Sequence, residues 1–478
     1  MKISEIYNLN KNQFQLDFVD IDVDSDTPLF LDSNLIRNAE GEFYQQMKNT
    51  MDCFFTDLIN LLSNSMIEKA RNICRHLGEI NETHLGLSKN ESRGRGVGEV
   101  NSDKIINALK SNEAIMGGYL ENIEDLRVLV EGFNKDMLSD MLTNILKKHL
   151  IDYTKAQCNL NNIQMTESVV TGSYWNAEKH KWENGYDSRL VINSKPVLLV
   201  PKNIVSFCLD GSCTKYRQHF VLNFLQDLNI KNRTLLVRER KKTKQLYVTK
   251  KSILENEPPM NKEYLTSFTI KYPEVLKRFK ENNKNKIKPL NGDLFNDINV
   301  SEICQILRQS LVEIEVGTEQ AAKFHDLMIG IFEFLLYPNL TNPVKEKPIN
   351  NGRKRIDICF TNSSKNGIFS WIPEKAYIPC PYVFVECKNY SNDVKNPELD
   401  QMIGRFSTRR GKLGIISCRR IDDEDLFISR CIDSYKENGC LIIPIVDADI
   451  YRCLEKNEKC CEEFEKIITE KTDKIILS

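Results

Sequence analysis

The chain has 478 residues, of which 41% are hydrophobic and 28% charged, and its 66 basic side chains nearly balance its 67 acidic ones. This composition is ordinary for a globular protein of about three domains, and it excludes disorder as the dominant state. It also excludes a global positive field, so a nucleic-acid site must come from local charge segregation. Because no long apolar segment and no apolar leader is present, we expect a cytoplasmic protein without membrane contact. The fifteen cysteines include no CxxC pair and indicate reduced, buried thiols.

Residues 1–165 have the pattern of a largely helical domain. From about 43 to 77, apolar residues recur mostly every three or four positions, which predicts a helix with one buried face. A basic, glycine-rich loop is expected at 88–98, and a further helix at 135–155. We expect this domain to serve recognition, regulation or oligomerisation.

Residues 166–300 form a mixed middle domain or a connector. The segment 166–200 is strand-like, and a helix is expected near 214–228. Between 231 and 251 there are nine lysines and arginines and one acid. This basic segment either guides DNA or forms a solvated charged hairpin.

Residues 301–455 alternate helices and strands, which predicts a mixed sheet with helices packed on it. The overall fold class is therefore α+β and multidomain, with a C-terminal α/β domain and a helical tail at 456–478. We expect helices at 301–315, 318–337, 397–410 and 423–437, and strands at 354–360, 366–379 (as a pair), 382–388, 412–418 and 440–446.

Two strand-like runs in this region carry carboxylates. Asp357 lies in an apolar run, and Tyr-Val-Phe-Val leads directly into Glu386, Cys387 and Lys388. On a strand, residues two apart share a face, so Glu386 and Lys388 project together. If the strands pair, Asp357 faces Glu386, and converging carboxylates require a cation. Oxygen ligands, with the backbone carbonyl of Cys387 as a further donor, favour Mg²⁺, with Mn²⁺ as a substitute. Lys388 is then placed to position a water and stabilise charge on a phosphate.

Two neighbouring helices offer further candidates. Glu333 is the single charge in the apolar run 327–337, so it is either an outer metal ligand or part of a structural salt bridge. Gln401 shares a predicted helix face with Arg405 and Arg409, where these side chains can meet a phosphate or the attacking water.

With these residues in place, the segment 318–446 resembles the PD-(D/E)xK nuclease superfamily, and within it the Mrr-like, restriction-associated branch. The matching positions are Glu333 on the first core helix, Asp357 on the second strand, Glu386-Cys387-Lys388 on the third, and Gln401 on the next helix. The resemblance implies a restriction-endonuclease-like fold and Mg²⁺-dependent hydrolysis of phosphodiester bonds, with DNA as the expected substrate, in prokaryotic restriction or anti-phage defence. Ile356 stands where the family motif has proline.

Local charge agrees with a nucleic-acid partner. Residues 351–412 hold eleven basic side chains against six acidic ones. A basic stretch of this kind can track a phosphate backbone. The predicted nucleic-acid-binding residues are Arg353, Lys354, Arg355, Arg405, Arg409 and Arg410.

Two other functions stay open. One is a non-catalytic nucleic-acid-binding or regulatory subunit with a relic nuclease fold. The other is a HEPN-like ribonuclease toxin, which would use the R-x4-H pattern of Arg71 and His76. For the nuclease we expect a homo-oligomer, since cutting two strands usually takes two copies of a single-site domain, or a partner protein or trigger.

Overall fold

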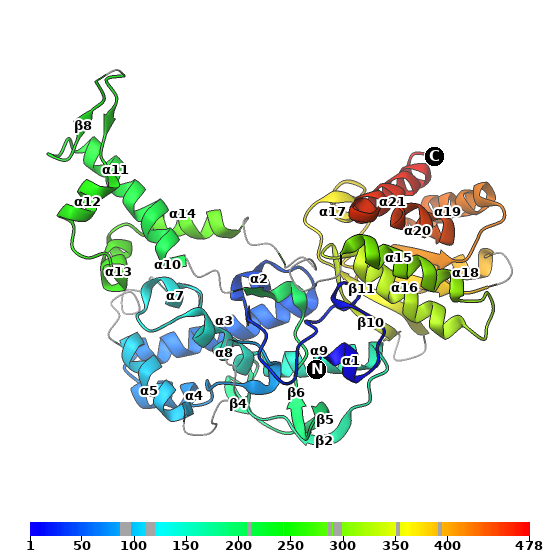
Figure 1. Cartoon of the computed structure of the whole chain (residues 1–478), viewed down its shortest axis with the longest axis horizontal. Helices are drawn as coiled ribbons and strands as arrows, with labels where there is room; N and C mark the ends of the chain where they lie inside the picture. Colours follow the sequence, from blue (N-terminus) through cyan, green and yellow to red (C-terminus); the bar gives the residue numbers. More distant parts are fainter. Residues whose placement is uncertain are drawn as a thin grey trace.

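The chain has two large hydrophobic cores. Figure 1 shows the N-terminal body and the C-terminal domain that hold them. In this computed structural model the described residues are 1–86, 97–110, 120–207, 212–241, 243–284, 289, 299–349, 354–390 and 394–478. The first core takes residues from Ile3 to Phe279, and the second takes residues from Ile303 to Ile475 together with Leu160. The first core therefore spans the predicted boundary at 165, and helices and strands on either side of that position pack together.

Helices dominate the N-terminal body, as the sequence predicts for this part of the chain. Its longest helix buries Tyr44, Met47, Met51, Phe54 and Leu58, which recur every three or four residues along one face. The helices are α1 (Ile3–Ile6), α2 (Ser33–Asn38), α3 (Glu42–Ser63), α4 (Ile67–Cys74), α5 (Val97–Lys110), α7 (Asp125–Leu129), α8 (Lys135–Ile145) and α9 (Lys147–Leu160). The short 3₁₀ turns are Gln13–Gln15, Asn81–Thr83 and Lys202–Ile204.

Short antiparallel strands cover this helical body. They are β1 (Leu29–Leu31), β2 (Thr166–Val170), β3 (Tyr174–Asn176), β4 (Lys181–Glu183), β5 (Tyr186–Ile192), β6 (Lys195–Val197) and β7 (Val205–Phe207). They pair as β1–β7, β3–β4 and β2–β5–β6. Among the described residues, no helix is long and apolar enough to cross a membrane.

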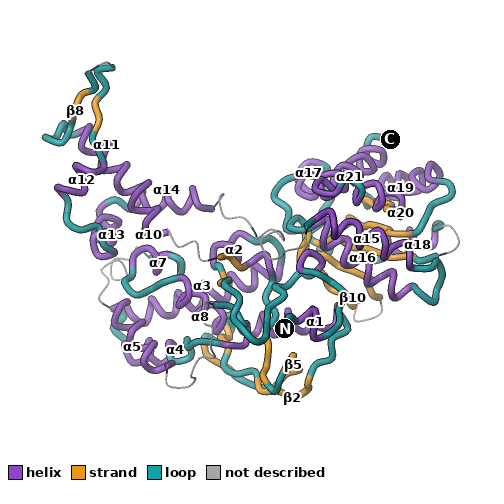
Figure 2. The backbone as a smooth tube through the Cα atoms, in the orientation of Figure 1, coloured by secondary structure: helices purple, strands orange, loops and turns teal. Residues whose placement is uncertain are grey.

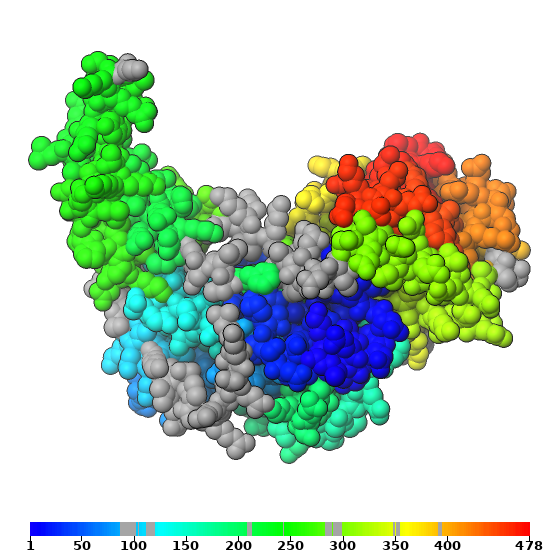
Figure 3. Space-filling view, viewed as in Figure 1, coloured from blue at the N-terminus to red at the C-terminus, as the bar shows by residue number. Residues whose placement is uncertain are grey.

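A helical arm projects from the N-terminal body, away from the C-terminal domain (Figures 1 and 3). Its elements are α10 (Ser212–Lys215), a π-helical turn (Tyr216–Val221), α11 (Leu222–Lys231), β8 (Arg238–Glu239), β9 (Leu246–Tyr247), α12 (Lys250–Asn256), α13 (Lys262–Lys271) and α14 (Pro273–Lys284). The basic segment forms the β8–β9 hairpin at the far end of this arm, where Leu235 is fully exposed.

The C-terminal domain is a five-stranded mixed sheet with helices packed on it (Figure 2). Its strands are β10 (Leu340–Ile349), β11 (Lys354–Asn362), β12 (Tyr382–Lys388), β13 (Leu413–Cys418) and β14 (Leu441–Val446). The strand order follows the chain, with antiparallel pairing from β10 to β12 and parallel pairing from β12 to β14. Its helices are α15 (Val300–Glu313), α16 (Ala321–Leu336), α17 (Gly367–Lys375), α18 (Asn396–Ile403), α19 (Glu424–Asn438), α20 (Asp447–Leu454) and α21 (Cys460–Ile476), with a 3₁₀ turn at Asn457–Lys459.

Three sequence predictions in this domain differ from the structure. The predicted strand pair at 366–379 is wrong, because this segment forms helix α17, which buries Ile368, Phe369 and Ile372 on one face. Strand β10 was not predicted, because Pro343, Pro348 and its lysines hide the apolar alternation. The helix predicted over 397–410 ends at Ile403, and residues 404–410 form turns and an isolated bridge from Ser407 to Gly411. The tail packs as α21, whose Phe464 and Ile467 are buried in the domain core.

Candidate active site

Strands β11 and β12 separate at the point where the candidate carboxylates lie. Their antiparallel pairing runs from Thr361 opposite Tyr382 to Ile358 opposite Val385. Beyond that point β12 remains bonded to β13 as far as Lys388, whereas β11 continues along β10. Asp357 and Glu386 are the next residues of the two strands, so both face the opening between them.

The two carboxylates each reach toward the backbone of the opposite strand. One oxygen of Asp357 lies 3.3 Å from the amide nitrogen of Cys387, and one oxygen of Glu386 lies 3.5 Å from the amide nitrogen of Asp357. Glu386 is 1% exposed, and Asp357 is half-buried. The predicted opposition of these two side chains across neighbouring strands is therefore present in the structure.

Lys388 and Gln401 complete one side of this group. The ammonium of Lys388 lies 3.5 Å from Glu386 Oε2 and 3.4 Å from Gln401 Oε1. Gln401 comes from α18, which begins with a proline in its first turn and buries Leu399 and Met402. The structure thus brings Asp357, Glu386, Lys388 and Gln401 together; strand spacing predicts the first three, and the family resemblance implies the fourth.

Arg405 occupies a different place from the one predicted. It follows the end of α18, its side chain is 8% exposed, and its guanidinium forms an ion pair with Glu386. Burial lowers the pKa of Arg405, and the negative charge of Asp357 opposes this shift. Arg405 is therefore a buried partner of the carboxylates, not an exposed contact for a phosphate backbone.

The donor set fits a hard divalent cation on one condition. Asp357, Glu386 and the carbonyl of Cys387 supply oxygen ligands, which suit Mg²⁺ and Mn²⁺. The contacts of both carboxylates with backbone amides are long, whereas Glu386 also pairs with Lys388 and Arg405. The condition is that the Arg405 guanidinium must give up part of its contact with Glu386.

Glu333, on α16, lies outside the carboxylate group. It belongs to a buried cluster with Lys202 and Asp17 between the two cores. Glu333 is 1% exposed and lies 3.6 Å from the ammonium of Lys202. Burial raises its pKa to about 8, with Asp17 acting in the same direction and Lys202 against it. Asp17 in turn accepts hydrogen bonds from Tyr153 (2.6 Å) and from the backbone of β10. The structure therefore supports the structural salt bridge for Glu333 and does not bring it into the carboxylate group.

Sequence reasoning missed His325, which α16 brings toward Asp357. Burial lowers the pKa of His325, and Asp357 is the largest influence acting in the other direction. Its Nε2 is buried and has no hydrogen-bond partner among the described residues. The pKa of His325 is therefore influenced by Asp357, and its Nε2 has no hydrogen-bond partner among the described residues. The sequence holds no signal for it, because His325 precedes the apolar run that marks this helix.

The other predicted nucleic-acid contacts have mixed surroundings, and Arg353 lies outside the described residues. Lys354 is exposed and donates to the carbonyl of Gly404, and Arg355 pairs with Glu346 at 3.0 Å. Arg410 donates to the carbonyl of Arg405, whereas Arg409 is exposed.

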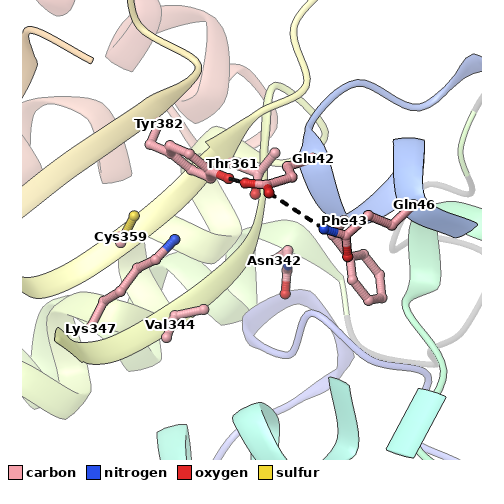
Figure 4. A pocket seen from close by; sticks show the side chains of 9 residues that line it. All are labelled: Glu42, Phe43, Gln46, Asn342, Val344, Lys347, Cys359, Thr361 and Tyr382. Carbon is pink, nitrogen blue, oxygen red and sulfur yellow. Dashed lines mark hydrogen bonds between the residues drawn. The ribbon is translucent and has the colours of Figure 1, made fainter. Parts of the chain in front are cut away.

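A cavity of about 280 Å³ lies between the N-terminal body and this sheet (Figure 4). On its sheet side, Cys359 and Thr361 follow Asp357 at intervals of two, so they share its face of β11. On its other side, Glu42 of α3 accepts a hydrogen bond of 2.9 Å from Tyr382. The N-terminal body therefore packs over the Thr361–Tyr382 end of the sheet face that carries the carboxylates.

The residues of the HEPN-like alternative are engaged in other contacts. Arg71 pairs with Glu68 and, at 2.8 Å, with Asp103. The ring of His76 packs against Trp182, and burial lowers its pKa. Both side chains therefore have partners other than each other. The glycine-rich loop predicted at 88–98 falls outside the described residues except at its end.

Comparisons with known proteins concern the N-terminal part of the chain. Residues 8–209 match the sequence profile of a family described as a domain of unknown function (DUF8370). This match covers less than half of the chain and ends before the arm. No curated protein and no solved structure matches the chain. Together the fold and these comparisons define a mixed α/β protein.

Proposed function

We propose that residues 300–478 form a metal-dependent nuclease with a restriction-endonuclease-like fold, which hydrolyses phosphodiester bonds in DNA. The observation that carries this proposal is the group at the opening between β11 and β12. There Asp357 and Glu386 lie on opposing strands, and Lys388 lies 3.5 Å from Glu386. Two acids and a lysine on diverging strands are the parts that metal-assisted phosphodiester hydrolysis needs.

The order of elements supports the same proposal. A buried helix, α16, precedes three antiparallel strands, and helix α18 then leads to a parallel fourth strand. The sequence resemblance to PD-(D/E)xK nucleases predicts this order. It also supplies the biological part of the proposal, which is prokaryotic defence against foreign DNA.

Each side chain of the group has a role in this proposal. A bound Mg²⁺ would neutralise phosphate charge and acidify a coordinated water. Asp357, Glu386 and the carbonyl of Cys387 would hold it. Lys388 would orient the attacking water and stabilise negative charge as it develops on the phosphate, and Gln401 would hold Lys388 in place through their 3.4 Å contact.

Arg405 has two functions under this proposal. In the free protein its guanidinium balances the buried charge of Glu386. A phosphate diester that enters the site offers the same guanidinium a second anion, to which arginine binds in bidentate geometry. The Arg405 guanidinium would then bind the phosphate as well as Glu386, and oxygens of Glu386 would become free to bind the cation.

The test is a nuclease assay on the purified full chain. Plasmid, linear duplex DNA, single-stranded DNA and RNA are incubated with Mg²⁺, Mn²⁺ or EDTA, for the wild type, Asp357→Ala and Lys388→Ala. Matched controls are Asp400→Asn and Lys375→Ala, which change exposed residues of the same domain. Metal-dependent DNA cutting that both site variants lose and both controls keep is expected. Cutting that survives Asp357→Ala would overturn the proposal.

A second candidate function follows from the Arg405–Glu386 ion pair itself. If that pair permanently excludes a cation, the domain is a non-catalytic nucleic-acid-binding subunit. Calorimetric titration with Mn²⁺ separates the two. Binding that disappears in Asp357→Ala favours the nuclease, whereas absence of binding together with retained DNA affinity favours the binding subunit.

A further inference from the structure

A second group of metal-ligand atoms lies in the N-terminal body, away from the carboxylates of the C-terminal sheet. Cys53 and Asp57 are four residues apart on α3, so their side chains share one helix face. The turn between β3 and β4 brings His180 to the same face. The Nδ1 of His180 lies 2.7 Å from Asp57 Oδ2 and 3.5 Å from Cys53 Sγ, and the sulfur lies 3.8 Å from the same Asp57 oxygen.

These distances approach those of a tetrahedral zinc site. With bonds of about 2.0–2.3 Å from zinc to nitrogen, oxygen and sulfur, neighbouring ligand atoms lie about 3.3–3.8 Å apart. Both distances from the sulfur fall in this range. The Asp57–His180 contact is a hydrogen bond of 2.7 Å, so it must widen by several tenths of an ångström when a cation replaces its proton.

The same geometry argues against a nucleophilic triad. In such a triad the acid and the nucleophile contact opposite nitrogens of the imidazole. Here the carboxylate and the sulfur both approach Nδ1. The nitrogen, oxygen and sulfur atoms all lie within 3.8 Å of one another. This arrangement fits a metal-coordination sphere better than a proton relay.

The hairpin that carries His180 is held firmly against α3. Trp175 pairs with Trp182 across β3 and β4, and Phe54 packs edge-on against Trp175 with ring centroids 5.0 Å apart. Phe54 is the residue after Cys53, so this aromatic contact fixes the hairpin beside the sulfur. The turn is closed by Asn176, whose side chain accepts hydrogen bonds from two backbone amides of the turn.

A hydrogen-bond donor beside the sulfur also supports Cys53 as a metal ligand. The indole nitrogen of Trp175, which can only donate, lies 3.5 Å from Cys53 Sγ. Donors to a metal-bound sulfur stabilise its thiolate form. A metal-bound cysteine is a thiolate, so binding a cation would release the thiol proton to solvent.

We propose that Cys53, Asp57 and His180 form a three-ligand site for a borderline transition metal, Zn²⁺ in the first place, with its fourth position open to a cavity. A mixed sulfur, nitrogen and oxygen set suits Zn²⁺ and not Mg²⁺. A cavity of about 470 Å³ adjoins the group, and Asp57, His180 and Trp175 are part of its wall. His180 is 61% exposed at the side chain, so the site has an entry path. Three protein ligands and an open position are typical of zinc that binds a further ligand.

The test uses Co²⁺ as a spectroscopic substitute in the tag-free, metal-stripped full chain. A sulfur-to-cobalt band in the near ultraviolet, with visible bands of tetrahedral cobalt, is expected to saturate at one equivalent. Cys53→Ser should abolish the near-ultraviolet band, and His180→Gln should weaken Co²⁺ binding at least tenfold. Because His180 is largely exposed, its substitution leaves folding intact even if the Cys53 variant is unstable.

Matched controls decide whether the band comes from this site. Cys461→Ser removes an exposed thiol of the C-terminal domain and should leave the band unchanged. Asp357→Ala should also leave it unchanged, which separates this site from the proposed nuclease centre. No sulfur band in the wild type, or a band that survives Cys53→Ser, would overturn the proposal. Azide should shift the visible bands, and bands that do not respond to azide would rule out the open fourth position.

Discussion

The guanidinium of Arg405 is buried against the carboxylate of Glu386, at the place where β11 and β12 separate. A buried charge that loses its partner costs about 3–5 kcal/mol. We therefore expect Arg405→Ala to lower the thermal midpoint in EDTA and Mn²⁺ to restore most of the loss, because the cation then balances Glu386. Mn²⁺ should stabilise the variant more than the wild type, which differential scanning fluorimetry across Mn²⁺ concentrations measures.

The control for this prediction is Arg405→Lys, which keeps a charge beside Glu386. It should be destabilised less in EDTA and respond less to Mn²⁺. An Arg405→Ala protein that melts lower and gains nothing from Mn²⁺ would show that Glu386 does not accept a cation.

The Glu333–Lys202 pair predicts a pH dependence of stability. Burial raises the pKa of Glu333 to about 8 in the folded chain, so the folded state favours the protonated acid. The unfolded chain releases this proton near its ordinary pKa of about 4.3. Stability from this group is therefore present in acid and is lost as the pH rises toward 8. Asp17, whose pKa burial also raises, acts in the same direction, whereas the lowered pKa of Lys202 acts against it at alkaline pH.

The expected result is that Glu333→Gln flattens the fall in stability between pH 5 and pH 8. Urea unfolding of the wild type and the variant at four pH values in this window measures it. Glu458→Gln, an exposed substitution in the same domain, is the control and should keep the wild-type slope. Equal slopes for wild type and Glu333→Gln would contradict the assignment.

Gly41 lies where the N-terminal body packs closely against Thr361 of the C-terminal sheet. Its φ of +106° is a conformation open almost only to glycine, and a Cβ added there would clash with the side chain of Thr361 on β11. We expect Gly41→Ala to destabilise the chain by about 1–3 kcal/mol from the backbone alone, with a further loss from the clash. Gly132→Ala is the matched control, because its φ is +81° and a Cβ there meets nothing within 4 Å. Comparing the thermal unfolding of the two variants isolates the effect of the clash with Thr361. Equal losses of stability would show that the Thr361 side chain moves aside at no cost in free energy.

The basic hairpin at the end of the arm predicts a salt-dependent contribution to DNA binding. Arg238, Arg240 and Lys241 are exposed there. Replacing all three by alanine should weaken binding to duplex DNA and lower the slope of log affinity against log salt by about one per lost phosphate contact. The control replaces exposed Lys436, Lys456 and Lys459, which changes the net charge equally. Fluorescence anisotropy across salt concentrations measures both, and equal slopes for the two triple variants would contradict a DNA contact at the hairpin.

The sequence predicts the part of the candidate site that depends on close neighbours within one strand. The alternation around Asp357 and the run before Glu386 fix their strands, and the i, i+2 rule places Lys388 beside Glu386. Partners distant in sequence could not be found this way. Glu333 meets Lys202 from the other core, and His180 reaches Cys53 across 127 residues, so neither contact leaves a local pattern.

The misread elements have equally specific causes. Segment 367–375 has β-branched and aromatic residues that favour a strand, yet its buried side chains fall on one helical face against α21. Arg405 was expected on the exposed face of a long helix. Because α18 stops at Ile403, the chain turns and carries Arg405 inward instead.

The separation of β11 from β12 has a mechanical consequence. Glu386 belongs to a strand that is bonded through Lys388 to the centre of the sheet. Asp357 belongs instead to the β10–β11 hairpin, which the N-terminal body touches through Asp17 and Gly41. The two carboxylates therefore lie on strands that are paired as far as Ile358 and Val385, but each strand has a different neighbour beyond that point. We expect a ligand or partner that displaces the N-terminal body to act on Asp357 through the β10–β11 hairpin, without touching either acid.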